Sequence, residues 1–499
     1  MSTEHLLRRT AKHSLFYIPS VVVPAIVGIV LIRIFTTVFS QAEFGYYNVT
    51  LSTLGLIKVF SVAWLSTSAV RFYAVFKNKN KEPVFFSTLL ISSLVSAFFV
   101  ALVAFIIFVA ISHQIQPQLA SALRVAFLAC IFISFFEVFI VIFRAALFPQ
   151  RYSFYWMMYV IAKPITGLLV IFLFNIGVQG LFVGFFITSF CLDLLLIKKL
   201  RLIHFFKLGN ISLPLIKQFA SYGFPLAASN LSFWILSLSD RYLIEFFKGS
   251  AQVGLYSVSY AISEKTLQFA YMALMLAAYP IIVENWEKHG DRTTQKLISD
   301  LTKYYFFLFL PILVFLVVLP REVVLFFSDR EFVQGAVVLP FIATGTFLYG
   351  LSQYVLKGFE LYKQSFSITK IALAAGGINI VSNILLIPRL GFLGASISCS
   401  VAFLVYLILA ILGARRVMPW LVPVRAVFSA IASASGMGVY LYFASGWIDN
   451  IFFKLALLVP TGLILFLLLL WATGGFTKND IGFVRSCFKS ENPRQTPHD

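Results

Sequence analysis

The chain has 499 residues, of which 60% are hydrophobic and only 12% are charged. Soluble domains carry about a quarter charged residues, so a soluble enzyme is excluded. The formal net charge of +19 does not indicate a nucleic-acid partner, because there is no basic soluble domain to bind one. Many apolar runs reach the ~20 residues that a helix needs to cross a bilayer. We therefore expect an all-α polytopic membrane protein.

Apolar windows separated by polar breaks predict about fourteen transmembrane helices. The first window follows basic residues, as in a signal peptide, but it is too long and no small-residue cleavage site follows it. We therefore expect it to be the first membrane helix. In chain order the helices are expected at 14–37, 45–72, 84–110, 119–145, 152–175, 178–197, 219–246, 252–282, 298–320, 332–356, 365–388, 391–413, 423–444 and 452–473.

Basic residues predict the orientation of these helices. Lysine and arginine are concentrated in alternate loops and in both terminal segments, which is typical of the cytoplasmic side of a membrane. The opposite loops contain only Lys248, Arg321, Arg330, Arg389 and Lys454. We therefore expect both termini to be cytoplasmic, which requires an even number of helices.

An internal repeat divides the chain. The eight residues from Ala42 and the eight from Ala251 both read Ala-(Glu/Gln)-x-Gly-x-Tyr-x-Val, at an offset of 209 residues. This offset covers six helices, so the two halves are expected to be parallel repeats with a substrate site between them. Gln150, Gly177 and Gly180 match Gln364, Gly391 and Gly394 at a similar offset. The expected organisation is an N-terminal six-helix bundle (1–200), a cytoplasmic amphipathic linker (201–218), a C-terminal six-helix bundle (219–415), helices 13 and 14 (416–475) and a cytoplasmic tail (476–499).

Five cations in the expected spans are the candidates for substrate binding. Charge inside a membrane is costly and usually faces a protein interior or a wet cavity. Arg33 and Lys58 lie in the first two helices, and Arg241 and Lys265 lie at similar depths in the second half. With Lys163 they predict a cavity of positive potential for an anionic substrate such as a lipid diphosphate. Three cations near span ends are expected to snorkel instead: Arg124, Lys303 and Lys370.

Acidic residues offer an alternative role for two of these cations. Arg241 and Lys265 could instead form structural pairs with the adjacent Asp240 and Glu264. Three acids are candidates for coupling transport to an ion: Asp240, Glu137 and Asp193. For Glu137 and Asp193, pairing with Arg144 or Lys198 is the simpler explanation and the one that the sequence favours.

No cofactor-binding pattern is found. Cysteine and histidine residues lack metal-ligand spacing, and there is no phosphate loop for ATP. We therefore expect no cofactor, and any driving force would come from a gradient of H⁺ or Na⁺.

The chain resembles the Wzx-type polysaccharide flippases of the multidrug/oligosaccharidyl-lipid/polysaccharide exporter superfamily. The resemblance lies in five segments in order: Phe44-Gly45-Tyr46-Tyr47, Ser221–Leu226, Asp240-Arg241, Val253–Tyr256 and Asn383–Ala395. It implies two six-helix bundles that alternate between inward-open and outward-open states. It also implies an inner-membrane flippase for undecaprenyl-diphosphate-linked oligosaccharide units, which serve surface polysaccharides such as O-antigen or exopolysaccharide. A polysaccharide polymerase and a chain-length regulator would then be partners.

Other functions remain open at this point. A drug or cation antiporter of the same superfamily would favour an acidic or apolar cavity, whereas the cations here outnumber the acids. A lipid II flippase would also suit a cationic cavity. A membrane glycosyltransferase or polymerase is disfavoured because no outside loop is long enough for a catalytic domain, and no loop resembles an ion-channel filter.

Overall fold

Helices make up almost all of the chain in the computed structural model, which describes residues 19–476. Residues 1–18 and the expected tail beyond Phe476 lie outside the described residues. The first half contains α2 (Pro19–Val38), α3 (Gln41–Lys58), η1 (Val59–Ala63), α4 (Trp64–Asn78), α5 (Glu82–Ile111), η2 (Ser112–Gln114), α6 (Pro117–Ala145), α7 (Pro149–Phe174), α8 (Gln179–Lys199), α9 (Leu202–Phe205) and η3 (Leu208–Asn210).

The second half repeats the pattern and adds two helices. It contains α10 (Leu213–Leu238), α11 (Asp240–Lys248), α12 (Ser250–Ser263), η4 (Glu264–Gln268), α13 (Phe269–Val318), α14 (Pro320–Phe327), η5 (Arg330–Val338), α15 (Leu339–Val355), α16 (Lys357–Leu361), α17 (Ser365–Leu390) and α18 (Phe392–Ala414). The additional helices are α19 (Val424–Ser445) and α20 (Ile451–Ala472).

Twelve of the described helical segments are long and apolar enough to cross a membrane, which confirms a polytopic all-α membrane protein. The expected spans 219–246 and 252–282 are also helical, in α10–α11 and in α12 through the start of α13, but they are not among the twelve. These two segments contain the charged pairs Asp240–Arg241 and Glu264–Lys265, which lower their apolar character.

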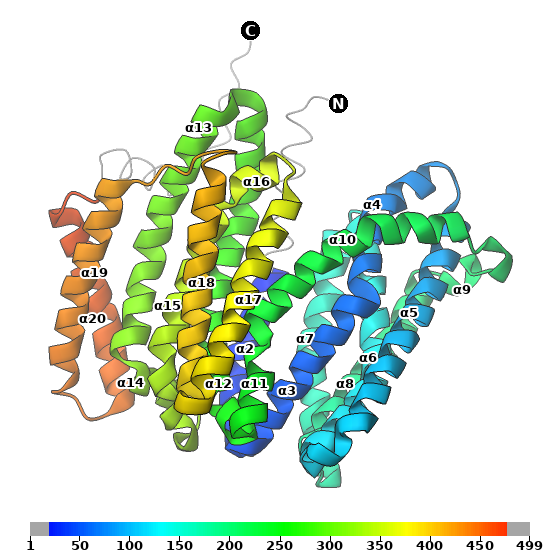
Figure 1. Ribbon diagram of the computed structural model, residues 1–499, viewed down its shortest axis with the longest axis horizontal. Helices are drawn as coiled ribbons and strands as arrows, with labels where there is room; N and C mark the ends of the chain where they lie inside the picture. Colours follow the sequence, from blue (N-terminus) through cyan, green and yellow to red (C-terminus); the bar gives the residue numbers. More distant parts are fainter. Residues whose placement is uncertain (1–18, 477–499) are drawn as a thin grey trace, which may run out of the picture.

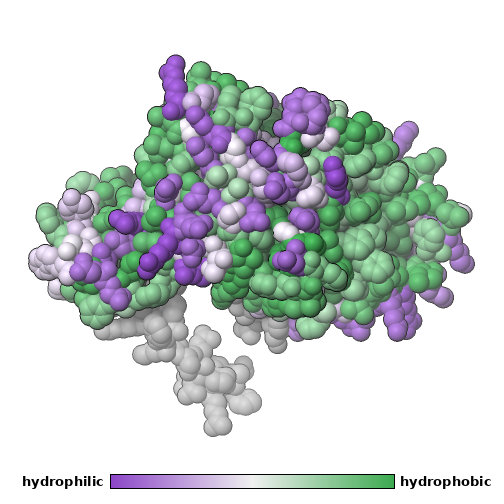
Figure 2. Space-filling view, turned by 90° about the horizontal axis from the view of Figure 1, so that it is seen from below, coloured by the Kyte–Doolittle hydropathy of each residue, from purple (hydrophilic) through white to green (hydrophobic). Residues whose placement is uncertain are grey.

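The helices form two groups, with α3 to α8 in one and α12 to α20 mainly in the other (Figure 1). We call the face at the top of Figure 1, where α13 turns and α19 begins, the termini face. The opposite face, where α3 and α12 begin, is called the closed face. Figure 2 views the closed face and shows hydrophilic residues running across it, with hydrophobic side chains at its flanks. Exposed apolar side chains such as Phe99 and Ile106 on α5 are suited to contact with lipid.

Two glycines allow the groups to meet on the closed face. A Cβ atom on Gly45 would overlap the backbone carbonyl of Ser250, and one on Gly254 would overlap that of Gln41. The lack of a side chain therefore lets α3 and α12 approach backbone to backbone. Both glycines belong to the repeated eight-residue segment. Ser40 supports the start of α3 through a capping box with Glu43.

Helix α10 contacts both groups. Its first half packs on α4, where Ser68 Oγ donates to the Phe219 carbonyl at 2.9 Å and the rings of Trp64 and Phe224 stack at 4.8 Å. Its second half packs on α17, where the hydroxyls of Ser229 and Thr369 lie 2.5 Å apart. Pro225 lies between the two contacts. The helix already begins at Leu213, inside the stretch expected to be a linker.

The long helix α13 contains parts of two expected spans. Gly290 has φ 71° and ψ −166°, which breaks the helix and reverses the chain at the termini face. The left-handed φ favours glycine at this turn.

Candidate substrate cavity

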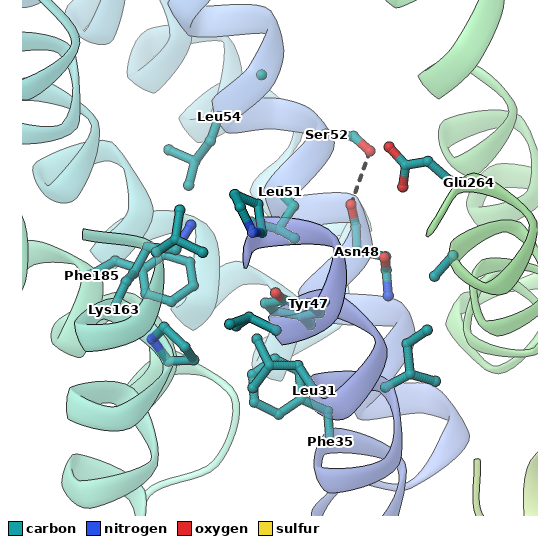
Figure 3. Close-up of a pocket in the computed structure, with 18 of the residues that line it drawn as sticks. Leu31, Phe35, Tyr47, Asn48, Leu51, Ser52, Leu54, Lys163, Phe185 and Glu264 are labelled. Carbon is teal, nitrogen blue, oxygen red and sulfur yellow. Dashed lines mark hydrogen bonds between the residues drawn. The ribbon is translucent and has the colours of Figure 1, made fainter. Parts of the chain in front are cut away.

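A cavity of about 410 Å³ lies between the two groups of helices. Helices α2, α3, α6, α7 and α8, from the first half of the chain, line it on one side, and α10, α11, α12 and η4, from the second half, line it on the other. Figure 3 shows Lys163 and Phe185 on one side of it, Tyr47 and Leu51 in the middle, and Glu264 opposite. The cavity therefore lies at the interface between the repeats, as a parallel-repeat transporter requires.

Four of the five cations predicted from the sequence line this cavity: Lys58, Lys163, Arg241 and Lys265. They come from α3, α7, α11 and η4, so both halves contribute two. Of the acids, Glu264 also lines the cavity. This arrangement concentrates positive charge at a single site within the membrane region.

Two of these lysines pair with carboxylates. Lys58 Nζ lies 2.5 Å from Glu137 Oε1, on α6, and Lys265 Nζ lies 3.0 Å from Glu264 Oε2. The pairing that the sequence favoured for Glu137, with Arg144 or Lys198, is therefore not the one observed. Four cations still face two carboxylates, so the balance of charge is positive.

Lys163 and Arg241 lie against aromatic rings. Lys163 Nζ is 4.4 Å from the Phe185 ring centre and 5.2 Å from that of Tyr159, and within residues 19–476 it forms no ion pair. The Arg241 guanidinium is 4.6 Å from the Tyr260 ring centre and donates to the Ser237 carbonyl at 3.1 Å. Rings stabilise a cation without neutralising its charge, so both groups keep their charge available for an anion.

A π-helical turn lies at one cavity lysine in each half, Lys58 in the first and Lys265 in the second. Lys58 directly precedes η1, and Lys265 lies within η4. Single π turns inside α-helices are common at functional sites because they alter the direction of nearby side chains. The near-equivalent positions support a common origin for the two lysine sites.

Arg33 lies outside this cavity, although the sequence grouped it with the other cations. Its Nη1 donates to the backbone carbonyls of Ser328 and Leu325, at the end of α14. Asp329 N–H in turn donates to Thr36 Oγ1 at 3.0 Å. These contacts connect the end of α2 to the closed face of the second group, where a cation is favoured at a helix C-terminus.

The candidate coupling residues Asp240 and Asp193 do not line the cavity. Asp240 is fully buried and accepts hydrogen bonds from Tyr256 and Asn383, both at 2.6 Å. Asp193 is 4% exposed, and both of its carboxylate oxygens lack a hydrogen-bond partner among the described residues. It lies in a largely apolar pocket between α5, α6 and α8. The expected pairing of Asp193 with Arg144 or Lys198 is not found there.

The sequence analysis missed the polar residues of α3 that line the cavity. Asn48 and Ser52 lie one turn apart, and Ser52 Oγ donates to the Asn48 carbonyl at 2.9 Å (Figure 3). Asn48 lies within the repeated segment, but at a position where the two copies differ, since its counterpart is Ser257. Neither residue carries a charge, and hence neither stood out from the many other polar residues in the spans.

Comparison with known proteins identifies a family that the sequence matches and solved structures that the fold resembles. A sequence model of a family described as "Polysaccharide biosynthesis protein" matches residues 10–286. No curated protein gives a significant match. Among solved structures, the chain is similar to "Lipid II flippase MurJ, inward closed conformation", with a TM-score of 0.71, 15% identity, and coverage of 95% of this chain and 99% of that one.

Two structures of multidrug resistance MATE family transporters of the MOP superfamily are also similar. The inward-facing one has a TM-score of 0.65 and 14% identity, covering 81% of this chain and 97% of that one. The outward-facing one has a TM-score of 0.55 and 15% identity, covering 81% and 95%. The fold is thus one that flippases and transporters share.

Proposed function

Because the chain belongs to the polysaccharide biosynthesis protein family, we propose that it is a flippase for lipid-diphosphate-linked oligosaccharides. Its substrate would be an undecaprenyl-diphosphate-linked repeat unit, moved from the cytoplasmic to the periplasmic leaflet of the inner membrane. The observation that carries this proposal is the cavity between the repeats with Lys58, Lys163, Arg241 and Lys265 on its wall.

The chemistry of the cavity suits a diphosphate. Lysine offers mobile point charges and arginine a planar fork for phosphate oxygens. Lys163 and Arg241 supply charge that no ion pair neutralises within residues 19–476. Lys58 and Lys265 could each exchange a carboxylate for phosphate oxygens when substrate enters. The polyprenyl tail would stay in the lipid.

Orientation follows from the distribution of basic residues. We place the termini face in the cytoplasm and the closed face in the periplasm. The close contact at Gly45 and Gly254 would then close the periplasmic side, so the structure corresponds to a state that loads from the cytoplasm. Transport requires this contact to open while the cytoplasmic side closes.

Coupling to an ion gradient is the second part of the proposal. Asp240, Glu137 and Asp193 are the candidate sites for H⁺ or Na⁺, because an ionisable residue within a membrane usually has a functional role. Asp240 is the most distinctive of them, because it lies on α11, directly beside the cavity residue Arg241. A polysaccharide polymerase and a chain-length regulator would act on the product in the periplasm.

A lipid II flippase is the alternative that the structural similarity favours, since the lipid II flippase compared above covers nearly the whole chain. Its substrate also carries a lipid diphosphate, so the cavity does not separate the two. A drug or cation antiporter is disfavoured by the positive charge of the cavity.

Deletion of the gene tests these functions together. The proposal predicts loss of a surface polysaccharide, with its lipid-linked repeat units retained in the cytoplasmic leaflet and normal peptidoglycan synthesis. Accumulation of lipid II instead would favour the alternative, and reduced drug efflux with normal polysaccharide would overturn the proposal.

Variants of the cavity test its role in the deletion strain. Lys163→Gln should abolish polysaccharide export at normal protein level in the membrane, whereas Lys163→Arg should retain part of it. Lys370→Gln is the matched control, because Lys370 lies on α17, is exposed and does not line the cavity. Normal export with Lys163→Gln would contradict a diphosphate site at this residue.

A further inference from the structure

A second chamber lies within the C-terminal group of helices. A space of about 470 Å³ is lined by α13, α15 and α16 with Phe233 of α10, and a smaller one of about 180 Å³ adjoins it. The two share the side chains of Phe233, Tyr349, Gln353 and Glu360. The volume of the larger space is within the range of small-molecule sites, about 300–1,000 Å³.

Aromatic rings form much of the chamber wall. The Tyr349 ring contacts those of Phe233, Tyr271 and Tyr406, with centre-to-centre distances of 5.6, 6.1 and 5.7 Å. Phe233 is 37% exposed and Tyr279 is 38% exposed, so both present ring surface to a ligand. Exposed ring faces bind flat, weakly polar C–H surfaces.

The charged groups of the chamber neutralise each other. Lys357 Nζ lies 2.7 Å from Glu360 Oε1 and 2.8 Å from Oε2, and it is 5.1 Å from the centre of the Tyr279 ring. The charge that this pair presents to a ligand is therefore close to zero. An uncompensated charge, which a small ion would require as its partner, is absent from the lining residues.

Hydrogen-bonding capacity remains available beside the rings. Two amide side chains, those of Gln268 and Gln353, line the chamber. Amide side chains on the wall of a chamber can hydrogen-bond the hydroxyl or amide groups of a ligand. A hydrocarbon tail would make no hydrogen bond with these amides.

The chamber adjoins the cationic cavity along two helical segments. On η4, Lys265 lines the cavity and Gln268, three residues later, lines the chamber; along α10, Leu238 lines the cavity and Phe233 the chamber. At ~1.5 Å per residue these steps correspond to roughly 5–8 Å. The chamber lies towards the termini face, since α10 begins and α13 turns at that face.

We propose that this chamber binds the saccharide of the substrate, with a sugar ring against Tyr279 and Phe233 and its polar substituents near Gln353. A pyranose has an apolar C–H face and a rim of hydroxyl or amide groups, which matches exposed rings beside two amide side chains and a neutralised ion pair. The inference rests on the proposed function, because a sugar joined directly to a diphosphate must lie next to the diphosphate site.

Binding of two lipids to the purified full-length protein tests this assignment. The probes are undecaprenyl diphosphate and the same lipid carrying one hexose or one N-acetylhexosamine, and native mass spectrometry measures Kd. We expect the wild type to bind both kinds of lipid, and at least one of the sugars to lower Kd about tenfold, equivalent to ~1.4 kcal/mol.

Three variants locate the effect of the sugar. Tyr279→Leu and Gln353→Leu should lose the gain in affinity from the sugar and keep the affinity for undecaprenyl diphosphate, which also shows that they are folded. Tyr279→Phe should retain the gain, because it keeps the ring. Tyr222→Leu is the matched control, since Tyr222 on α10 is also 38% exposed but does not line the chamber.

The outcomes separate the two proposals. Equal Kd for all the lipids, or an unchanged sugar effect in both leucine variants, would overturn the chamber as a saccharide site while leaving the diphosphate site intact. Failure of the wild type to bind even undecaprenyl diphosphate would overturn the proposed function and the inference with it.

Discussion

Gly45 and Gly254 make the same contact from opposite halves of the chain. Gly45 lies on the carbonyl of Ser250, and Gly254 lies on that of Gln41. Each pair member is 209 residues from its counterpart, so the contact is reciprocal and follows the internal repeat. The closed face is thus formed by the segment in which the two halves are most alike.

Alanine at either glycine should prevent this contact from closing. The added Cβ atom would meet backbone, which cannot move aside as a flexible side chain can. We expect Gly45→Ala and Gly254→Ala each to lower transport about tenfold or more, as a loss of ~1.4 kcal/mol in the closed state would produce. Transport of a fluorescent lipid-linked saccharide in proteoliposomes measures the effect.

The control for the glycine variants is Gly377→Ala in α17, where an added Cβ atom meets nothing within 4 Å. It should be neutral or slightly stabilising, because alanine favours helix. Wild-type rates from both closed-face variants would show that the contact does not limit the cycle.

Glu137→Gln should distinguish the structural role of Lys58, as the ion-pair partner of Glu137, from its role in binding substrate. The two side chains are 33% and 25% exposed, so we expect a loss of about 1–2 kcal/mol in stability, less than the ~3–5 kcal/mol of a fully buried pair. Affinity for undecaprenyl diphosphate should stay the same or rise, because Lys58 becomes free. Lys58→Gln should weaken that affinity. If both variants weakened it equally, Lys58 would act only through the ion pair.

Asp240→Asn should remove the dependence of transport on an ion gradient. The substitution is nearly isosteric and keeps an oxygen for Tyr256 or Asn383, but it removes the negative charge. Transport in proteoliposomes is compared with and without an imposed gradient of Na⁺ or H⁺. Asp193→Asn is measured in parallel, and loss of gradient dependence in that variant alone would move the coupling site to α8.

Arg33→Gln should weaken the contact between α2 and α14 at the closed face without altering the affinity for substrate. Its guanidinium holds backbone carbonyls at the end of α14 and does not line the cavity. We expect a loss of about 1–3 kcal/mol in stability, typical of hydrogen bonds from a charged group, measured by thermal denaturation in detergent. A large loss of affinity for undecaprenyl diphosphate would show that Arg33 takes part in binding the substrate.

Hydropathy and periodicity predicted the helices well. Every expected span corresponds to a helical segment in the described residues, in the expected order. The ends were less accurate: the span expected at 45–72 extends from Gln41 to Asn78, because helices continue beyond the apolar core. A hydropathy window detects the apolar stretch of a helix that contacts lipid. It does not detect the more polar turns that continue the helix at either end.

The partners of the charged residues could not be predicted. Lys58 and Glu137 are 79 residues apart in sequence, and only the packing of α3 on α6 brings them together. Arg33 was expected beside the other cations, but it donates to backbone carbonyls at the end of α14 and does not line the cavity. Depth follows from position in a span, whereas the face that a side chain occupies depends on tertiary packing.

Helix α10 has a mechanical consequence for the cycle. It is attached to α4 through Ser68 and Trp64 on one side of Pro225, and to α17 through Ser229 on the other. Rotation of one group of helices against the other must bend α10 or detach one of its ends. The energy needed to bend or detach α10 would therefore set the activation barrier of the empty protein. The stiffness of this helix would limit how fast any substrate can cross the membrane.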